Sequence, residues 1–350
     1  MPVAIEIGRR LVGPGQPCLI IAEAGVNHNG DKALARELVT MAAQCGADAI
    51  KFQTFRARAL AAPTAPKAAY QRSESVDDET QREMLERLEL PRSSYRELAD
   101  LCAALGLIFL SSPFDEECVD FLEALGMVAF KIPSGEITNL PLLAHVARKG
   151  KPIILSTGMS RMEEVALAMK TIRTSCGVPV ILLHCVSMYP ADPEAVNLRA
   201  MEAMAKAFAV PVGYSDHTLG IEVAVAAVAR GACVIEKHIT LDHSLPGPDQ
   251  KASIEPAQLK ALVRAIRNVE AAMGDGRKNP TSEELRNAVV VRKSVAAACD
   301  IPSGTNIRAD MLVRIRPGTG ISPVYLNRIV GRRARRDIPA GTLIEWEMVW

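Results

Sequence analysis

The stretch PVGYSDHTLGIEVAVAAVARGACVIEKHIT (211–240) contains two short apolar runs separated by an amphipathic segment. The runs at 211–217 and 233–240 have the length of buried strands, and the segment at 221–230 has the apolar spacing of a helix. A strand, a helix and a second strand in this order are typical of a parallel sheet whose faces are covered by helices.

The same alternation extends back along the chain to residue 19. Six further runs of strand length are LIIAEAG (19–25), AIKFQTF (49–55), IFLSSPF (108–114), MVAFKIPS (127–134), PIILSTG (152–158) and PVILLHCV (179–186). Further helices are expected at 31–45, 92–105, 162–175 and 256–273. Eight strands in this order predict an α/β fold of the (β/α)8 TIM-barrel type. An open, doubly wound sheet is the competing architecture, but its first turn is usually a glycine-rich dinucleotide motif, and here that turn reads EAGVNHNGD.

Two segments depart from this pattern. Residues 56–90 are long for a connection between strand and helix, so we expect an excursion near the mouth of the barrel. After Met273 the sequence GDGRKNPTSEE is polar and rich in chain breakers. We therefore place the barrel at 1–275, a linker at 276–290 and a compact β-rich domain at 291–350. Within that domain, IPSGT and IPAGT predict one turn that is used twice.

Charge and cysteine content narrow the class of protein. The 41 basic and 40 acidic residues leave a net charge of +1, so no nucleic-acid groove or anionic membrane surface is expected. The eight cysteines form no C-x-x-C pair and indicate buried free thiols in a reducing compartment. Because the N-terminus lacks a signal-peptide pattern and no apolar run reaches ~18 residues, we expect a cytoplasmic protein.

Polar side chains gather at the ends of the predicted strands, where the active site of a (β/α)8 barrel lies. A strand that is buried on both faces has no packing reason to end in this way, so the pattern predicts a site. The residues concerned include Glu23, Lys51, Gln53, Lys131, Ser134, Glu136, Ser156, Ser187, Tyr189, Ser215, His217, Glu236 and His238.

The residue types suggest a phosphate and a metal ion. Two lysines among several hydroxyl groups suit a phosphate, although pairing of a lysine with Glu23 or Glu236 for barrel stability is the alternative. His217 and His238 end neighbouring strands, so their imidazoles are predicted to share one ion that stays open to substrate, although a lone histidine is usually a core residue. Glu23 is either a general acid/base or a structural partner of Lys51.

Seven motifs in fixed order resemble the sialic acid synthase family, which includes N-acetylneuraminate, legionaminate and pseudaminate synthases. They are IIAEAGVNHNGD, ADAIKFQTF, FKIPSGEITNLPLL, ILSTGMS, HCVSMYP, VGYSDHTLG and EKHITLD…GPDQKASIEP, and residues 291–350 resemble the antifreeze-like (SAF) domain of these enzymes. The resemblance implies condensation of phosphoenolpyruvate with an open-chain N-acylated hexosamine and water, to give a nonulosonic acid and phosphate. N-acetylmannosamine is the expected sugar and N-acetylneuraminate the product. The alternative is a diacetamido-trideoxyhexose, as used by a legionaminate or pseudaminate synthase.

Carried over residue by residue, the resemblance implies a role for each candidate. His217 and His238 would bind a divalent ion, commonly Mn²⁺, with Mg²⁺ or Co²⁺ as alternatives, and Glu23 would be the catalytic carboxylate. The phosphoenolpyruvate ligands would be Lys51, Lys131, Ser134, Ser156, Ser187 and Ser215. The sugar ligands would be Gln53, Glu136, Tyr189, Asp249 and Arg316. Some family members have Asn where this chain has Ser187, and many have His where it has Gln250.

The resemblance also implies a homodimer with exchanged domains. Arg316 lies in the RPGTG turn (316–320), which in family members is delivered by the SAF domain to the barrel of the partner. Without the resemblance, Arg316 would be interpreted as a solvated loop charge.

Two other functions compete with the synthase interpretation. A barrel aldolase would use Lys131 or Lys237 to form a Schiff base with pyruvate and would need no metal. A non-catalytic carbohydrate- or ice-binding protein would explain the SAF-like module, but the terminal segment is rich in arginine instead of forming a regular threonine face. Because few aromatic residues lie between them, these arginines indicate a solvated or dimer-facing surface and not a nucleic-acid site. They are Arg328, Arg332, Arg333, Arg335 and Arg336.

Overall fold

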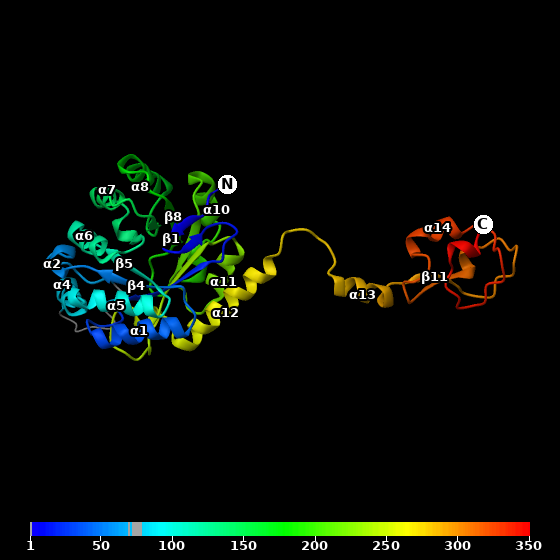
Figure 1. Ribbon diagram of the computed structural model, residues 1–350, viewed down its shortest axis with the longest axis horizontal. Helices are drawn as coiled ribbons and strands as arrows, with labels where there is room; N and C mark the ends of the chain where they lie inside the picture. The colour runs from blue at the N-terminus through cyan, green and yellow to red at the C-terminus, as the bar shows by residue number, and fades with distance from the viewer. Residues whose placement is uncertain (1, 69–70, 72–78) are drawn as a thin grey trace. The chain divides into compact units, whose positions relative to one another are not determined.

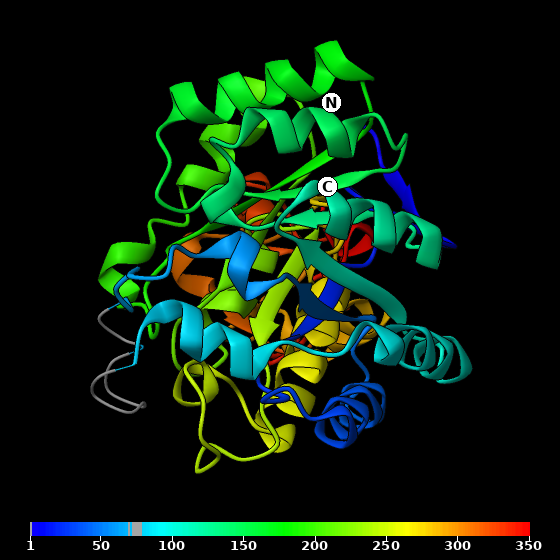
Figure 2. The same ribbon diagram turned by 90° about the vertical axis from the view of Figure 1, so that its left-hand side faces the viewer.

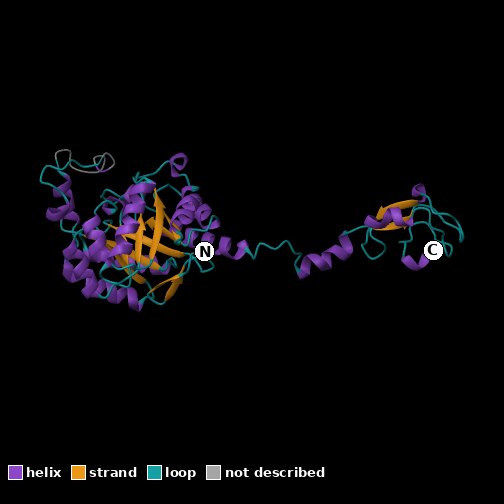
Figure 3. Cartoon of the chain, turned by 90° about the horizontal axis from the view of Figure 1, so that it is seen from above, coloured by secondary structure: helices purple, strands orange, loops and turns teal. Residues whose placement is uncertain are grey.

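The computed structural model describes residues 2–68, 71 and 79–350, which form two compact units, Met1–Gly274 and Asp275–Trp350. Part of the predicted excursion at 56–90 therefore lies outside the described residues. In the first unit, helices surround a central group of strands (Figures 1 and 3).

The central sheet has eight parallel strands in the order β5-β4-β3-β10-β9-β8-β7-β6. β10, the last barrel strand along the chain, pairs with β3, the first. β5 and β6, at the two ends of this order, also lie against each other, so the sheet closes into a barrel. Each strand falls within one predicted segment, which confirms the (β/α)8 prediction and excludes the open sheet. The strands are β3 (Leu19–Gly25), β4 (Ala49–Thr54), β5 (Ile108–Pro113), β6 (Phe130–Ile132), β7 (Ile153–Ser156), β8 (Val180–Cys185), β9 (Val212–Asp216) and β10 (Val234–His238).

The helices that cover the barrel follow the strands along the chain. The predicted helix at 31–45 is α1, and it begins after Asp31, whose carboxylate accepts hydrogen bonds from the backbone N–H groups of Ala33 and Leu34. Such a cap satisfies donors that the first turn of a helix leaves free. The longer helices of this unit are α1 (Lys32–Gln44), α5 (Arg92–Ala104), α6 (Glu116–Leu125), α7 (Leu140–Ala147), α8 (Met162–Ser175), α10 (Ala200–Phe208), α11 (Glu222–Ala229) and α12 (Pro256–Met273), and a shorter one is α9 (Pro193–Val196).

Side chains that alternate along each strand divide the core into an outer and an inner part. The same alternation determines which polar side chains point into the barrel. Ile20 and Ala22 of β3 belong to the outer core between barrel and helices, whereas Leu19 and Ile21 belong to a second, inner core. The N-terminal hairpin of β1 (Ile5–Ile7) and β2 (Arg10–Val12) contributes to this inner core. Successive side chains of a strand face opposite sides, so the next inward position on β3 is Glu23. The inner positions therefore change from apolar to polar toward the carboxyl ends of the strands.

The described part of the excursion forms two short helices, α2 (Ala57–Leu60) and α4 (Gln81–Leu88). They pack on a small apolar cluster of Val26, Phe55, Met84 and Leu88. Figure 2 views the barrel from the side on which these helices lie, and they pass in front of the strands. The described part of the excursion therefore shares a small hydrophobic core with residues that follow β3 and β4.

The second unit is built from α13 (Ser282–Val291), β11 (Ser294–Ala297), β12 (Leu312–Ile315) and α14 (Leu326–Ile329). The two strands pair antiparallel. Ile301 and Ile338 exchange two backbone hydrogen bonds of 2.9 Å, and the threonine N–H of each repeated motif donates to its proline carbonyl at 3.1 Å. The prediction that IPSGT and IPAGT form one turn used twice is confirmed.

The predicted linker at 276–290 includes most of α13. Thr281 and Glu284 form a capping box at the start of this helix, each side chain satisfying the other residue's backbone N–H. This cap stabilises a helix in a segment whose composition indicated an irregular chain.

Six of the eight cysteines are buried, as predicted, whereas Cys176 and Cys299 are exposed because they lie at a helix end and in a surface loop. The prediction of burial is wrong for these two. Among the helices of the described residues, none has both the length and the apolar character that a membrane crossing requires.

Candidate active site

The polar ends of the barrel strands meet in one cavity of about 480 Å³. This volume lies in the range of sites for small ligands. All predicted site residues except Asp249 and Arg316 line the cavity, namely Glu23, Lys51, Gln53, Lys131, Ser134, Glu136, Ser156, Ser187, Tyr189, Ser215, His217 and His238.

Two buried lysines and two buried glutamates form a charged cluster in the cavity. The Nζ atom of Lys51 lies 2.8 Å from Oε2 of Glu23 and 3.8 Å from Oε2 of Glu236, and Nζ of Lys131 lies 3.3 Å from Oε1 of Glu236. The sequence left open whether the lysines pair with Glu23 or Glu236 or face a ligand. In the structure they do pair with these carboxylates, and they also line the cavity. Glu236 was predicted among the polar strand ends and as a possible lysine partner, but it was given no ligand or catalytic role. It lies two residues before His238 on the same face of β10, and it lines the cavity.

The pKa values of Glu23 and Glu236 are shifted in opposite directions. Burial raises the pKa of Glu23 to about 7, although the charge of Lys51 acts in the opposite direction. Burial also acts to raise the pKa of Glu236, but the charges of Lys131 and Lys51 outweigh it and hold that pKa below the ordinary glutamate value. Paired carboxyl groups whose pKa values are pushed apart are a common basis for acid/base roles. Glu23 is the one placed to exchange a proton near neutral pH.

Gly25 allows Glu23 and His238 to approach each other. The strand has a bulge between Glu23 and Gly25, and Gly25 adopts a left-handed conformation with φ of 53°. A Cβ atom at this position would lie 3.3 Å from Oε1 of Glu23 and 3.4 Å from the ring of His238. Glycine therefore suits both the backbone conformation and the close approach.

His217 and His238 lie together at the ends of β9 and β10, with ring centroids 5.5 Å apart. The ring of Tyr189 lies 4.2 Å from that of His217. Nδ1 of His217 lies 2.8 Å from the carbonyl oxygen of Val186, and donation of its proton there leaves Nε2 with a free lone pair. Nδ1 of His238 is buried without a hydrogen-bond partner in the described part of the chain. Both rings therefore have a nitrogen suited to a metal ion.

The donor set matches an open metal site. Among the described residues, no group of three or more His, Cys, Asp or Glu side chains is arranged to hold an ion. Two imidazoles would leave the remaining positions to water and substrate oxygen, as a catalytic ion requires. The predicted pair of ligands fits such an ion.

Hydroxyl groups gather around the backbone of Gly158. Oγ of Ser134 accepts a hydrogen bond of 2.9 Å from the Gly158 N–H and lies 3.0 Å from Sγ of Cys185. A Cβ atom at Gly158 would lie only 2.4 Å from Oγ of Ser187. The buried hydroxyl of Ser156 has no hydrogen-bond partner in the described chain. These groups form a hydroxyl cradle whose hydrogen-bonding groups are of the kind that suits an anion. Gly158 and Cys185 belong to it, although the sequence analysis did not select them.

Lys237 lies outside the cavity. Its Nζ atom donates to Oδ2 of Asp216 at 2.6 Å and to the carbonyl oxygen of Thr218 at 2.7 Å. On β10 it separates Glu236 from His238, and these two residues line the cavity. The pair of Lys237 and Asp216 therefore links β9 and β10 from the outer side of the barrel, and Lys237 is not placed to form a Schiff base with a ligand in the cavity.

Replacement of Lys237 by methionine is expected to lower the free energy of unfolding by about 3–5 kcal/mol, because it leaves the buried carboxylate of Asp216 unpaired. Urea denaturation would measure this loss. Lys206→Met, on the exposed face of α10, is the matched control and should change stability by no more than about 0.5 kcal/mol. A loss below about 1 kcal/mol for Lys237→Met would contradict the role given to the pair.

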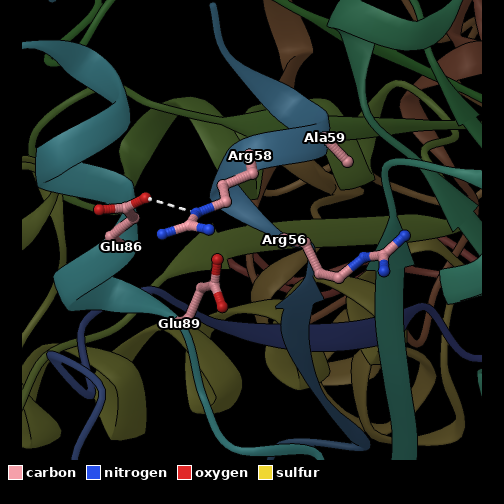
Figure 4. A pocket seen from close by; sticks show the side chains of 5 residues that line it. All are labelled: Arg56, Arg58, Ala59, Glu86 and Glu89. Carbon is pink, nitrogen blue, oxygen red and sulfur yellow. Dashed lines mark hydrogen bonds and ion pairs between the residues drawn. The ribbon is translucent and has the colours of Figure 1, made fainter. Parts of the chain in front are cut away.

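A second cavity, of about 520 Å³, lies between α2 and α4 (Figure 4). It is lined by Arg56, Arg58, Ala59, Glu86 and Glu89 and contains none of the predicted site residues. Nε of Arg58 lies 3.3 Å from Oε1 of Glu86, whereas Arg56 extends away from them and pairs with Glu117. Exposed ion pairs of this kind are common on protein surfaces and indicate no chemistry.

Asp249 is not among the residues that line the cavity, and Arg316 belongs to the second unit. Asp249 is buried, and its Oδ2 lies 3.9 Å from Nδ1 of His238. Arg316 follows β12 in the second unit and is exposed. The hydroxyl of Ser294 orders its turn by donating to the Pro317 carbonyl at 2.6 Å and accepting from the Gly320 N–H at 2.8 Å. The roles of Asp249 and Arg316 as sugar ligands stay predictions.

Comparison with known proteins identifies the family. The model of the NeuB family matches residues 38–278, which is more than half of the chain. The chain belongs to the NeuB family. The SAF domain model matches residues 292–349.

Relatives of this NeuB-family chain are similar over nearly its whole length. The N,N'-diacetyllegionaminic acid synthase of Legionella pneumophila is 49% identical over 341 residues, which cover 96% of each chain. The enzyme of the same name from Campylobacter jejuni is 47% identical over 328 residues, covering 93% of this chain and 98% of its own. The crystal structure of N-acetylneuraminic acid synthetase from Leptospira borgpetersenii, in complex with citrate, matches with a TM-score of 0.73 and 33% identity. That match covers 82% of this chain and 95% of the other.

These similarities confirm the predicted family and the order of a barrel followed by a SAF domain. The NeuB-family chain is an enzyme of the nonulosonic acid synthase type. Similarity to whole synthases, and not to the SAF module alone, also opposes the non-catalytic alternative.

Proposed function

We propose that this NeuB-family enzyme condenses phosphoenolpyruvate with 2,4-diacetamido-2,4,6-trideoxymannose and water to give N,N'-diacetyllegionaminic acid and phosphate. The observation that carries the proposal is 49% identity, over 96% of both chains, to a synthase named for that product. N-acetylmannosamine, the sugar first expected from the motifs, is the second candidate. It is supported by 33% identity to an N-acetylneuraminic acid synthetase.

The charged cluster and the hydroxyl cradle would bind phosphoenolpyruvate. Lys51 and Lys131 supply positive charge, and Ser134, Ser156 and Ser187 supply hydrogen-bonding groups in the same cavity. Groups of both kinds are needed to compensate a phosphate and a carboxylate on one small molecule. Ser215 is tied to the cluster because its hydroxyl donates to Glu236 at 3.1 Å.

His217 and His238 would hold a divalent ion, with Mn²⁺ as the first candidate. When bound, such an ion supplies Lewis-acid polarisation of the aldehyde oxygen of the open-chain sugar. Tyr189, which packs on His217, would limit the space beside the reacting aldehyde. Gln53 and Glu136, which line the same cavity, would orient the remaining polar groups of the sugar.

The reaction forms one carbon–carbon bond and breaks one carbon–oxygen bond. The electron pair of the C2=C3 bond of phosphoenolpyruvate attacks C1 of the sugar, and the aldehyde oxygen takes up a proton to become a hydroxyl group. Water adds to C2 while Glu23 accepts its proton. The bond from C2 to the bridging oxygen then breaks, so phosphate leaves with that oxygen, and loss of the hydroxyl proton at C2 produces the keto group.

An isotope experiment tests this chemistry. With ¹⁸O in the bridging position of phosphoenolpyruvate, the released phosphate should retain the label, and mass spectrometry should show a product with the mass of N,N'-diacetyllegionaminic acid. Unlabelled phosphate would contradict cleavage of the C–O bond. As a second arm, borohydride with pyruvate should trap no adduct, because the synthase chemistry forms no Schiff base. An adduct on Lys131 would replace this proposal by the aldolase alternative.

A further inference from the structure

One wall of the active-site cavity is apolar. Leu60 of α2, Leu85 of α4 and Phe114, which follows β5, line this cavity together with Ala68, and the excursion also contributes Gln71 and Gln81 to the lining. The residues at the carboxyl ends of the strands in the same cavity are mostly charged or carry hydroxyl groups. The proposed chemistry gives the apolar wall no role.

The apolar wall has fixed support. Leu60, Leu85 and Phe114 pack on the buried cluster beneath α2 and α4. The ring of Phe114 meets that of Phe55 edge to face, with centroids 6.0 Å apart and an interplanar angle of 88°. Side chains held in this way present a shaped surface, because moving them would disrupt the small core.

The opposite side of the two helices is charged. Arg58, Ala59 and Glu86 line the second cavity, which lies between α2 and α4 (Figure 4). Leu60 and Leu85, which neighbour them in the chain, line the active-site cavity. The two helices therefore turn Leu60 and Leu85 toward the active-site cavity, where Gln81 at the start of α4 also lies, and turn Arg58 and Glu86 away from it.

The chain path places the apolar wall at the outer end of the cavity. Lys51 lies within β4, which ends at Thr54, whereas α2 begins beyond it at Ala57. In the proposed reaction C1 of the sugar lies beside phosphoenolpyruvate at the strand ends. The remote end of the sugar, with its C4 substituent and C6, would therefore extend toward α2 and α4.

We infer that Leu60, Leu85 and Phe114 form a subsite for the methyl groups at the remote end of the sugar, and that this subsite selects a 6-deoxy-4-acetamido sugar. Such a sugar has a methyl group at C6 and an acetyl methyl at C4, whereas N-acetylmannosamine has hydroxyl groups at both positions. Burial of methyl groups against apolar side chains is favourable, and burial of unpaired hydroxyl groups is costly. The inference rests on the proposed function and adds the residues that determine sugar specificity.

The test compares two sugars in three variants. In the wild type, kcat/KM should be higher for 2,4-diacetamido-2,4,6-trideoxymannose than for N-acetylmannosamine. Leu85→Gln should reduce this ratio about tenfold, because one apolar contact in a pocket has that order of effect, and should leave KM for phosphoenolpyruvate unchanged. Leu85→Met, which keeps an apolar side chain of similar volume, should retain the ratio. Glu86→Gln changes the next residue in the chain, which lines the second cavity, and is the matched control. It should also retain the wild-type ratio.

The outcomes separate failure of the inference from failure of the proposed function. If the wild type prefers the diacetamido sugar and Leu85→Gln keeps the wild-type ratio with an unchanged melting temperature, the inferred subsite is wrong and the function stands. Should Leu85→Gln melt earlier, Leu60→Gln provides the same comparison from α2. If the wild type does not prefer the diacetamido sugar, the proposed substrate and the inferred subsite both fail.

Discussion

Glu23→Gln is expected to lower kcat by a factor of about 10²–10⁴, with KM for phosphoenolpyruvate nearly unchanged. Glutamine has the size of glutamate but cannot accept the proton of the attacking water. Lys51 would lose its partner at 2.8 Å, yet Glu236 remains 3.8 Å from the same ammonium group. The charge that holds phosphoenolpyruvate is thus preserved, and the loss should fall on the chemical step.

Steady-state phosphate release at varied phosphoenolpyruvate would measure both constants. Glu194→Gln, at an exposed position, is the matched control and should behave as the wild type. Comparable losses in kcat and in affinity for phosphoenolpyruvate would show that Glu23 acts in binding, and the acid/base assignment would then be wrong.

Replacing both His217 and His238 by alanine is expected to remove metal binding and to lower kcat by about 10²–10³ or more, because polarisation of a carbonyl by an ion is worth several kcal/mol. The two rings lie 5.5 Å apart, and each retains a nitrogen suited to coordination. Electron paramagnetic resonance of free Mn²⁺ would report binding directly, without relying on turnover.

His145→Ala is the control for loss of a histidine, since His145 pairs with Asp120 on α6 and lines no part of the cavity. It should bind Mn²⁺ as the wild type does. Full wild-type activity in excess chelator, or unchanged Mn²⁺ binding by the double variant, would refute the metal site.

The barrel and the polar ends of its strands could be predicted, because both follow from the residue pattern within each strand. Apolar runs of strand length marked all eight strands, and the two-residue period of a strand places Glu236 and His238 on one face and Lys237 on the other. That same period, applied in the sequence, would have removed Lys237 from the candidates for a Schiff base.

The rest depends on contacts between distant segments. The hydroxyl cradle joins Ser134, Gly158, Cys185 and Ser187, which follow or end three different strands, and no spacing in the chain specifies their convergence. The apolar wall likewise requires Leu85 and Phe114 to share a small core with residues near β3 and β4. In the predicted linker, composition indicated irregular chain, but the capping box of Thr281 and Glu284 favours a helix.

The most direct test of the proposed function is phosphate release from phosphoenolpyruvate in the presence of Mn²⁺, with three sugars compared. They are 2,4-diacetamido-2,4,6-trideoxymannose, N-acetylmannosamine and the corresponding diacetamido-trideoxyaltrose. We predict the highest kcat/KM with the first sugar. Preferential release with either of the others would contradict the proposed substrate, and release with none of them, from folded protein loaded with Mn²⁺, would contradict the synthase chemistry itself.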